Sequence, residues 1–202
     1  PVFPGNEISP DVTPALARAA KIALALRAKT NCSWGFPLKA ACWARLGEAD
    51  SAWMTWQNQL RYVDPRGKSP VNNYGLFPNF FNSDGADVIM NGNGCATAVL
   101  IEMLVQSRPG EIRLLPALPK FFAEGSVKGI CARGGFVVDM DWRNGAVATA
   151  KIYSKLGNMC AIRMMVKPKV YCGSSPIKTV RLKNGLFSFK TTPGGHYNIV
   201  AG

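Results

Sequence analysis

Apolar side chains recur three and four positions apart in four stretches of the first half of the chain, a spacing typical of amphipathic helices. The first stretch opens with Thr13, a suitable N-cap, and Pro14, which fits the first helical position. It continues as a run rich in Ala and Leu, which predicts close packing against neighbouring helices. We therefore expect helices over residues 14–27, 35–46, 50–63 and 94–107.

The pattern changes after Gly110, where apolar and polar residues begin to alternate with the period of a strand that buries one face. Two dipeptides, Asn144-Gly145 and Asn184-Gly185, are favourable hairpin turns. The expected strands cover residues 112–115, 135–142, 146–154, 160–166, 179–182, 186–190 and 196–200. The sequence thus predicts an α+β chain with a helical domain over residues 1–111 and a β-domain over residues 112–202.

Residues 64–93 form a long segment without clear periodicity, and a connection of this length inside a domain is usually functional or disordered. Its aromatic content argues against disorder. It ends in Asn91-Gly92-Asn93, which could be no more than a tight turn into the last helix. Asn amides also suit sugar hydroxyls, because each amide offers both donors and acceptors. Tryptophans such as Trp34 and Trp43 would suit a sugar site, where ring faces stack on aromatic side chains, although Trp53 and Trp56 are spaced as core residues.

Charge separates the two halves more sharply than composition does. The chain has 202 residues and a formal net charge of +12, and residues 112–202 alone hold fourteen Lys and Arg against three Asp and Glu. Such a field attracts polyanions, including anionic glycans, although a solvated basic surface without a partner explains it equally well. About 18 uninterrupted apolar residues would be needed to span a membrane, and no such run occurs.

Histidine and cysteine usage excludes several kinds of site. The six cysteines form no Cys-x-x-Cys pair, and the single histidine, His196, begins the expected last strand, where we expect it to be structural or exposed. Neither a metal site nor a Ser-His-Asp triad is therefore predicted. We expect the cysteines to be buried free thiols. One or two disulfides are the alternative if the protein is secreted. The chain carries no nucleotide-binding glycine motif, and no cofactor is expected.

Ordered blocks along residues 1–160 resemble glycoside hydrolase family 95, the alpha-L-fucosidase type. In chain order these blocks are Phe3-Pro4-Gly5, Thr13-Pro14-Ala15-Leu16, Ser33-Trp34-Gly35-Phe36-Pro37, Cys42-Trp43-Ala44-Arg45-Leu46, Leu76-Phe77-Pro78-Asn79-Phe80-Phe81, Asn91-Gly92-Asn93, Leu114-Leu115-Pro116-Ala117-Leu118-Pro119 and Ala132-Arg133-Gly134-Gly135-Phe136.

The resemblance implies the last helices of an (α/α)6 barrel followed by an antiparallel β-sandwich, and an inverting hydrolase of alpha-L-fucosides or alpha-L-galactosides. On that basis Asn91 is the candidate catalytic position, and Trp34, Asn79 and Asn93 are candidate substrate-binding residues. The family's acid and its substrate motif precede Pro1, so we expect an N-terminal portion of the same protein as partner, and this chain alone to be inactive. Secretion is expected from the family and from the glycosylation sequon at Asn31.

One departure from the family pattern matters, because the family motif carries Asp where this chain has Asn91. An amide cannot accept a proton as a carboxylate does, and loss of a general base costs on the order of 10²–10⁴ in rate. A non-catalytic carbohydrate-binding relative is therefore the alternative function. A polyanion-binding module built on residues 112–202 is a third possibility, without a nucleic-acid motif to support it.

Overall fold

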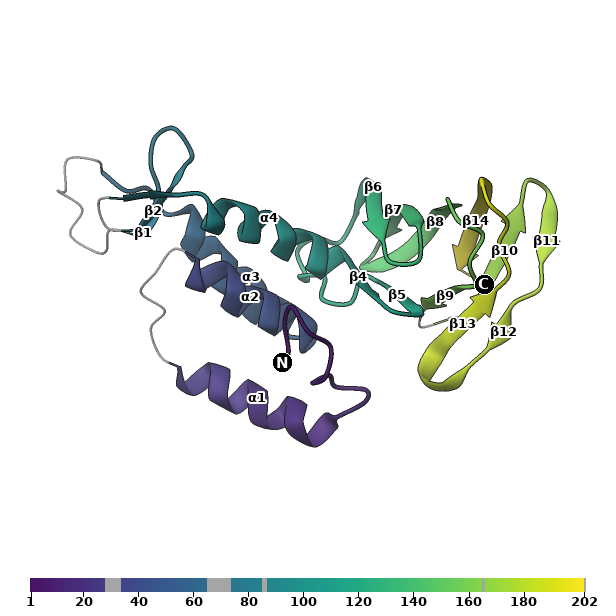
Figure 1. Cartoon of the computed structure of the whole chain (residues 1–202), viewed down its shortest axis with the longest axis horizontal. Helices are drawn as coiled ribbons and strands as arrows, with labels where there is room; N and C mark the ends of the chain where they lie inside the picture. The colour runs from purple at the N-terminus through teal and green to yellow at the C-terminus, as the bar shows by residue number, and fades with distance from the viewer. Residues whose placement is uncertain (28–33, 65–73, 85–86, 165, 202) are drawn as a thin grey trace. The chain divides into compact units, whose positions relative to one another are not determined.

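The computed structural model describes residues 1–27, 34–64, 74–84, 87–164 and 166–201 (Figure 1). The chain divides into two compact units, residues 1–103 and 104–202, each with buried residues of its own. The predicted glycosylation residue Asn31 lies outside the described residues.

Helices form most of the first unit. In chain order they are α1 (Pro14–Leu26), α2 (Gly35–Arg45), α3 (Ala49–Gln57) with the 3-10 turn η1 (Asn58–Leu60) after it, and α4 (Asn91–Leu104). The helices predicted over residues 14–27 and 35–46 are confirmed. Gly47, with φ of 78°, ends α2 in the left-handed conformation and allows α3 to return along α2 (Figure 1). Small alanines let the two helices approach closely, and Ala40, Ala41, Ala44 and Ala52 are fully buried.

The apolar surface of α1 remains largely uncovered, contrary to the expected close packing. Ala17 is its buried residue, whereas Leu16, Ile22 and Leu26 are 54%, 61% and 76% exposed. The composition predicted the helix correctly. The packing expectation was wrong for this chain, because the described residues of the first unit supply no neighbour for most of the α1 surface.

A small antiparallel sheet occupies part of the segment that we expected to lack regular structure. Its strands are β1 (Tyr74–Leu76), β2 (Asn82–Asp84) and β3 (Asp87–Ile89), paired in the order β1-β2-β3. Tyr62 forms a parallel bridge to Leu76, which ties the sheet to the chain following η1. The sheet leads directly into α4, so the Asn91-Gly92-Asn93 turn lies at a strand-to-helix junction.

The second unit contains two sheets. One has six strands in the order β11-β10-β14-β8-β7-β6, and the other has five in the order β12-β13-β9-β5-β4. Their bounds are β4 (Val105–Arg108), β5 (Glu111–Leu114), β6 (Gly125–Ala132), β7 (Phe136–Arg143), β8 (Ala146–Ser154), β9 (Cys160–Arg163), β10 (Pro168–Cys172), β11 (Ser175–Ile177), β12 (Val180–Arg181), β13 (Leu186–Phe189) and β14 (Gly195–Ala201), with the short turn η2 (Lys183–Gly185) before β13. Pairing is antiparallel except between β5 and β9, which are parallel.

One apolar core is shared by side chains from both sheets. Val138, Met140 and Trp142 of β7 are buried beside Ile162 of β9, and the alternation read from the sequence is confirmed. The expected Asn144-Gly145 turn is also confirmed, because both residues have positive φ and join β7 to β8. The described chain is therefore α+β, with helices in one unit and predominantly antiparallel sheets in the other.

The structure shows the state of five cysteines and the surroundings of His196, and it can be searched for membrane-spanning helices and metal sites. Cys42, Cys95, Cys131, Cys160 and Cys172 are all free thiols. His196 is exposed and stacks on Tyr153, with 4.7 Å between the ring centroids, which fits the structural role expected of it. Within the described ranges, no helix has the length and apolar character needed to cross a membrane, and no group of three or more His, Cys, Asp or Glu could hold a metal ion.

Candidate functional site

The turn of Asn91, Gly92 and Asn93 forms the first residues of α4. Asn91 is exposed, and its Oδ1 accepts a hydrogen bond from the backbone N–H of Gly92 at 2.8 Å. This bond satisfies one of the amide groups that every helix N-terminus leaves without an intrahelical partner. The Asn91 side chain is thus held at the helix start by a hydrogen bond to the next backbone N–H.

Asn93 connects this turn to the neighbouring loop. Its Oδ1 accepts from the backbone N–H of Asn82 at 2.9 Å, and its Nδ2 donates to the carbonyl of Phe80 at 2.9 Å. Phe80 has φ of 64° in a tight turn, where the Oδ1 of Asn79 accepts from Phe81 N–H at 3.2 Å. Both ends of the Asn93 amide therefore hold the loop against the start of α4, and one acceptor lone pair and one N–H remain for other partners.

Gly92 is required where two buried amides meet the turn. A Cβ at this position would overlap the Oδ1 of Asn82 and lie 2.8 Å from the Nε2 of Gln59. Gln59 comes from η1 and Asn82 from β2, so the glycine lets three elements converge on one point. Neither Gln59 nor Asn82 is distinguished by any motif in the sequence.

These two buried side chains have unused hydrogen-bonding atoms. Gln59 is 1% exposed and Asn82 is fully buried, and among the described residues both amide atoms of Gln59 and the Oδ1 of Asn82 lack a hydrogen-bond partner. The Nδ2 of Asn82 donates to the carbonyl of Gly75 at 2.9 Å. A buried polar atom without a partner costs about 1–3 kcal/mol, so such atoms normally bind water or a ligand.

A cavity of about 200 Å³ opens beside these amides. Its lining combines apolar side chains with three amides: Trp56, Gln59, Leu60, Leu76, Phe80, Asn82, Asn93, Ala96, Thr97 and Leu100. The Nε1 of Trp56 donates to the carbonyl of Ala96 at 2.9 Å, and its ring stacks on Trp53, with centroids 4.9 Å apart. An indole wall with amide donors and acceptors is chemistry that suits a hydroxylated ring. No acidic residue is present among the described residues that line the cavity.

The other residues proposed from the sequence lie elsewhere in the first unit. Trp34 is 45% exposed and immediately precedes α2, and Asn79 is exposed in the turn before Phe80. Neither of them lines the cavity, and Asn91 does not line it either, although Asn93 of the same turn does. The structure thus brings Asn93 to a cavity and adds Gln59 and Asn82 to the candidate set.

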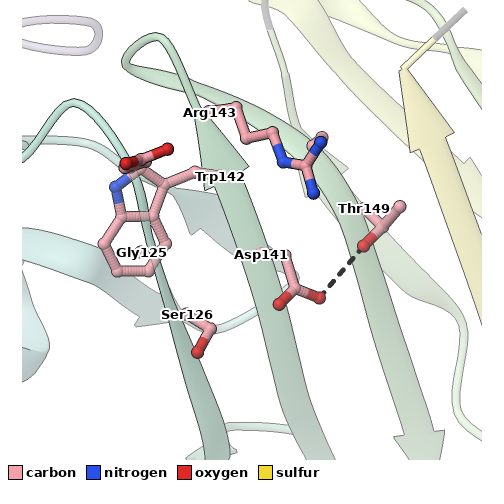
Figure 2. A pocket seen from close by; sticks show the side chains of 8 residues that line it. Gly125, Ser126, Asp141, Trp142, Arg143 and Thr149 are labelled. Carbon is pink, nitrogen blue, oxygen red and sulfur yellow. Dashed lines mark hydrogen bonds between the residues drawn. The ribbon is translucent and has the colours of Figure 1, made fainter.

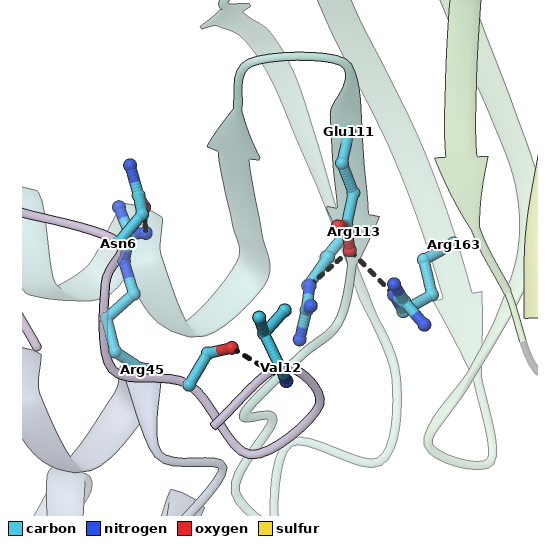
Figure 3. Close-up of polar contacts among 7 residues, drawn as sticks. Asn6, Val12, Arg45, Glu111, Arg113 and Arg163 are labelled. Atoms are coloured by element: carbon cyan, nitrogen blue, oxygen red, sulfur yellow. Dashed lines mark hydrogen bonds and ion pairs between the residues drawn. The ribbon is translucent and has the colours of Figure 1, made fainter. Parts of the chain in front are cut away.

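A buried ion pair fixes the far part of α4. Arg45 of α2 donates through Nη2 to the Oε1 of Glu102 at 2.8 Å. It also donates through Nη1 to the Oδ1 of Asn6 at 2.7 Å (Figure 3). Its guanidinium lies 5.8 Å from the ring centroid of Phe3, within range of a cation–π contact. Arg45 therefore attaches both α4 and the N-terminal segment to α2, and Glu102 serves this link.

Comparisons with known proteins cover nearly the whole chain. The model of the glycosyl hydrolase family 95 catalytic domain matches residues 1–104, and the model of the glycoside hydrolase family 95 C-terminal domain matches residues 106–199. Alpha-L-fucosidase 2 of Arabidopsis thaliana is 36% identical over 157 residues, which cover 76% of this chain and 18% of that protein. A probable alpha-fucosidase A of Aspergillus oryzae is 33% identical over 122 residues, covering 56% of this chain and 16% of that protein.

Among solved structures, a family 39 glycoside hydrolase from Bacteroides cellulosilyticus WH2 aligns with a TM-score of 0.31 and 11% identity, over 82% of this chain and 31% of that one. A likeness this weak carries no argument about the fold. The chain spans less than one fifth of the length of either curated relative.

Proposed function

The chain belongs to glycoside hydrolase family 95, and from this premise we propose that it forms part of an inverting glycosidase that cleaves alpha-L-fucosides or alpha-L-galactosides. The observation that carries the proposal is the cavity beside Asn93, which is also lined by Gln59 and Asn82, two buried amides with atoms that have no partner among the described residues. Both curated relatives are named as fucosidases, which favours a fucoside as substrate.

In this proposal the cavity holds the sugar and the catalytic acid comes from another stretch of polypeptide. Inversion needs an acid that protonates the leaving oxygen and a base on the opposite face of the ring that takes a proton from the attacking water. The bond from the anomeric carbon to the leaving oxygen breaks as the bond to the water oxygen forms, and the products are free sugar and alcohol. The described cavity residues supply neither carboxyl group, so a single-chain reaction is not expected.

The missing stretch would also cover the apolar surface of α1. Leu16, Ile22 and Leu26 are exposed on this helix, and burial of each such side chain is worth about 1.5–3 kcal/mol. We propose that the remaining helices of an (α/α)6 barrel, from an N-terminal portion of the same protein, pack here, with the second unit as a β-sandwich domain. Secretion, with glycosylation at Asn31, is part of the same proposal and is tested by whether a glycosidase that removes N-linked glycans reduces the mass.

The alternative function is sugar binding without turnover, and Asn91 favours it. The amide at this position has no proton-accepting carboxylate, and its Oδ1 already accepts from Gly92 N–H. Such a protein would retain the cavity and its amides while losing assistance to the attacking water. The alternative and the leading proposal therefore share the binding site and differ in the chemistry at one residue.

The test uses the protein with its N-terminal portion present and an aryl alpha-L-fucoside as substrate. We expect release of the aryl alcohol, and an increase in kcat of about 10²-fold or more in Asn91→Asp, because a carboxylate restores assistance to the water. Asn144→Asp makes the same chemical change at a hairpin turn of the second unit and should leave the rate unchanged. Sugar binding without release by either protein would establish the alternative, and absence of both binding and release would refute the assignment of this cavity.

A further inference from the structure

A second cavity, of about 600 Å³, opens on the six-stranded sheet of the second unit, at the strands β6, β7 and β8 (Figure 2). This volume falls within the range of about 300–1,000 Å³ that is usual for small-molecule sites. The lining residues are Glu124, Gly125, Ser126, Asp141, Trp142, Arg143, Ala148 and Thr149. All of them belong to the second unit, and none of them lines the cavity beside Asn93.

A β-bulge marks the place where the cavity opens. Asp141 of β7 pairs with Thr149 of β8, whereas the next residue, Trp142, pairs with Val147, so Ala148 is the extra residue. Bulges interrupt the ladder and redirect side chains, and they are frequent beside functional sites. Asp141 is exposed and Trp142 is buried on the core side of β7, and both residues line this cavity.

Hydrogen bonds fix two of the side chains that line the cavity, Trp142 and Asp141. The indole N–H of Trp142 donates to the carbonyl of Phe122 at 2.9 Å, and the residue is 6% exposed, so its ring forms a fixed apolar wall. A Cβ on Gly125 would overlap that ring, and glycine therefore allows the backbone to lie against it. Thr149 Oγ1 donates to Asp141 Oδ2 at 3.1 Å, which orients the carboxylate and leaves its Oδ1 available (Figure 2).

The charge of the cavity differs from that of its surroundings. Residues 112–202 contain fourteen Lys and Arg but only three Asp and Glu, and two of these three acids, Glu124 and Asp141, line the cavity. The carboxylates disfavour a polyanion at this point, even though the unit as a whole attracts one. Arg143, the basic residue of the lining, disfavours a cation.

The remaining ligand class is a neutral molecule that both donates and accepts hydrogen bonds. Carboxylates only accept and a guanidinium only donates, whereas a sugar hydroxyl does both and can bridge the two kinds of group. Within the described part of the chain, Glu124, Ser126 and Arg143 have no hydrogen bond or ion pair that would occupy their side chains. We propose that this cavity is a non-catalytic binding site for a neutral saccharide, held by Asp141, Glu124 and Arg143 above the Trp142 wall.

The test is a titration of the full chain, uniformly labelled with ¹⁵N, with methyl α-L-fucopyranoside and methyl β-D-galactopyranoside. We expect saturable shifts at the amides of Ser126, Asp141 and Thr149 with at least one glycoside. Asp141→Asn and Arg143→Ala should each weaken binding about tenfold, because each removes one charged hydrogen-bond partner. Arg133→Ala removes an arginine of the turn between β6 and β7 that does not line the cavity, and should change affinity by less than about twofold.

Two other probes distinguish the competing explanations. Galacturonate should bind more weakly than the neutral glycosides, and calcium chloride alone should not shift these amides. The proposal is overturned if the glycosides shift none of the three amides, if galacturonate or calcium binds better there, or if Arg133→Ala and Arg143→Ala lose affinity equally. Catalysis is not measured in this titration, so failure of the glycosidase proposal would leave its result unaffected.

Discussion

Arg45 of α2 and Glu102 of α4 form a two-point ion pair inside the helical unit, with Nε 2.5 Å from Oε2 and Nη2 2.8 Å from Oε1. The two side chains are only 6% and 15% exposed. Removal of one partner from a buried pair leaves an uncompensated charge and commonly costs about 3–5 kcal/mol. We therefore expect Glu102→Gln to lower the free energy of unfolding by several kcal/mol, measured by urea denaturation of the full chain.

The chain provides a matched control for this substitution. Glu48 pairs with Lys21, but these side chains are 41% and 34% exposed, and exposed pairs contribute about 0–1 kcal/mol. Glu48→Gln should thus change the free energy of unfolding by at most about 1 kcal/mol. Equal effects of the two substitutions would show that the Arg45–Glu102 pair does not join α2 to α4 as described.

The carboxylate of Glu111 forms ion pairs with two arginines that lie opposite each other on neighbouring parallel strands. Arg113 of β5 lies opposite Arg163 of β9, and Glu111 binds the Nε of both, at 2.6 Å in the case of Arg163 (Figure 3). Burial raises the pKa of Glu111, but the hydrogen bonds from Arg163 and Arg113 outweigh it, and the pKa is lowered from 4.5.

This depressed pKa predicts an acid-dependent loss of stability. Below pH 4.5 the unfolded chain binds a proton at Glu111 more readily than the folded chain does, so its contribution is present above that pH and is lost as pH falls through the folded pKa. Glu111→Gln should destabilise the chain at pH 7 and flatten the decline of stability between neutral and acid pH. Glu124→Gln, at an exposed carboxyl, should leave the slope as it is. An unchanged slope in Glu111→Gln would contradict the prediction.

The thiols should differ widely in reactivity. Cys160 is fully buried, and burial raises its pKa to about 12, so about one molecule in 10⁴ would carry the thiolate at pH 8. Cys131 is exposed on β6. In a native chain treated with a disulfide reagent at pH 8, we expect Cys131 to react in a fast phase that Cys131→Ser abolishes. Cys160 should react only after unfolding, and a fast phase lost in Cys160→Ser would show that the core opens readily.

Gln59 should be dispensable for folding but necessary for ligand binding. Both of its amide atoms are buried without a partner among the described residues, so Gln59→Leu removes a burial cost while keeping a similar volume. We expect unchanged or greater stability in urea, together with weaker fucoside binding by the protein that includes its N-terminal portion. Asn58→Leu, at the partly exposed neighbouring position whose Nδ2 donates to the Met54 carbonyl, provides the control. A large loss of stability in Gln59→Leu would indicate that the amide has a structural partner.

Local signals predicted the elements that depend on local physics. Thr13-Pro14 and the alanine run correctly indicated α1, and Asn144-Gly145 correctly indicated the turn between β7 and β8. Residues 105–107 were wrongly assigned to the last helix, because no helix breaker precedes Pro109. They belong to β4 instead, since pairing of Gln106 with Arg113 and of Val105 with Leu114 places them in a sheet.

The candidate site could be predicted only in part from the sequence, because some of its residues are brought together by tertiary packing and not by a local motif. Asn93 lies in a motif with a recognisable composition, and it does line the cavity. Gln59 lies at the end of an ordinary amphipathic helix, and only its burial against Gly92 and Asn82 distinguishes it from a surface glutamine. The small sheet of β1, β2 and β3 was likewise unexpected, because Asn82, Ser83 and Asp84 have little intrinsic preference for strands.

Two glycines of the Asn91–Gly94 turn should respond to alanine in opposite directions. At Gly92 the added Cβ would overlap the buried amides of Asn82 and Gln59, and overpacking of this kind commonly costs about 1–3 kcal/mol. At Gly94, inside α4, the added Cβ meets nothing within 4 Å, and the change from Gly to Ala in a helix gains about 0.5–1 kcal/mol. Urea denaturation should show Gly92→Ala destabilised and Gly94→Ala stabilised. Because the two positions differ only in what surrounds them, equal effects would mean that Gln59 and Asn82 do not pack against the turn, and the cavity proposed as the sugar site would lose its polar wall.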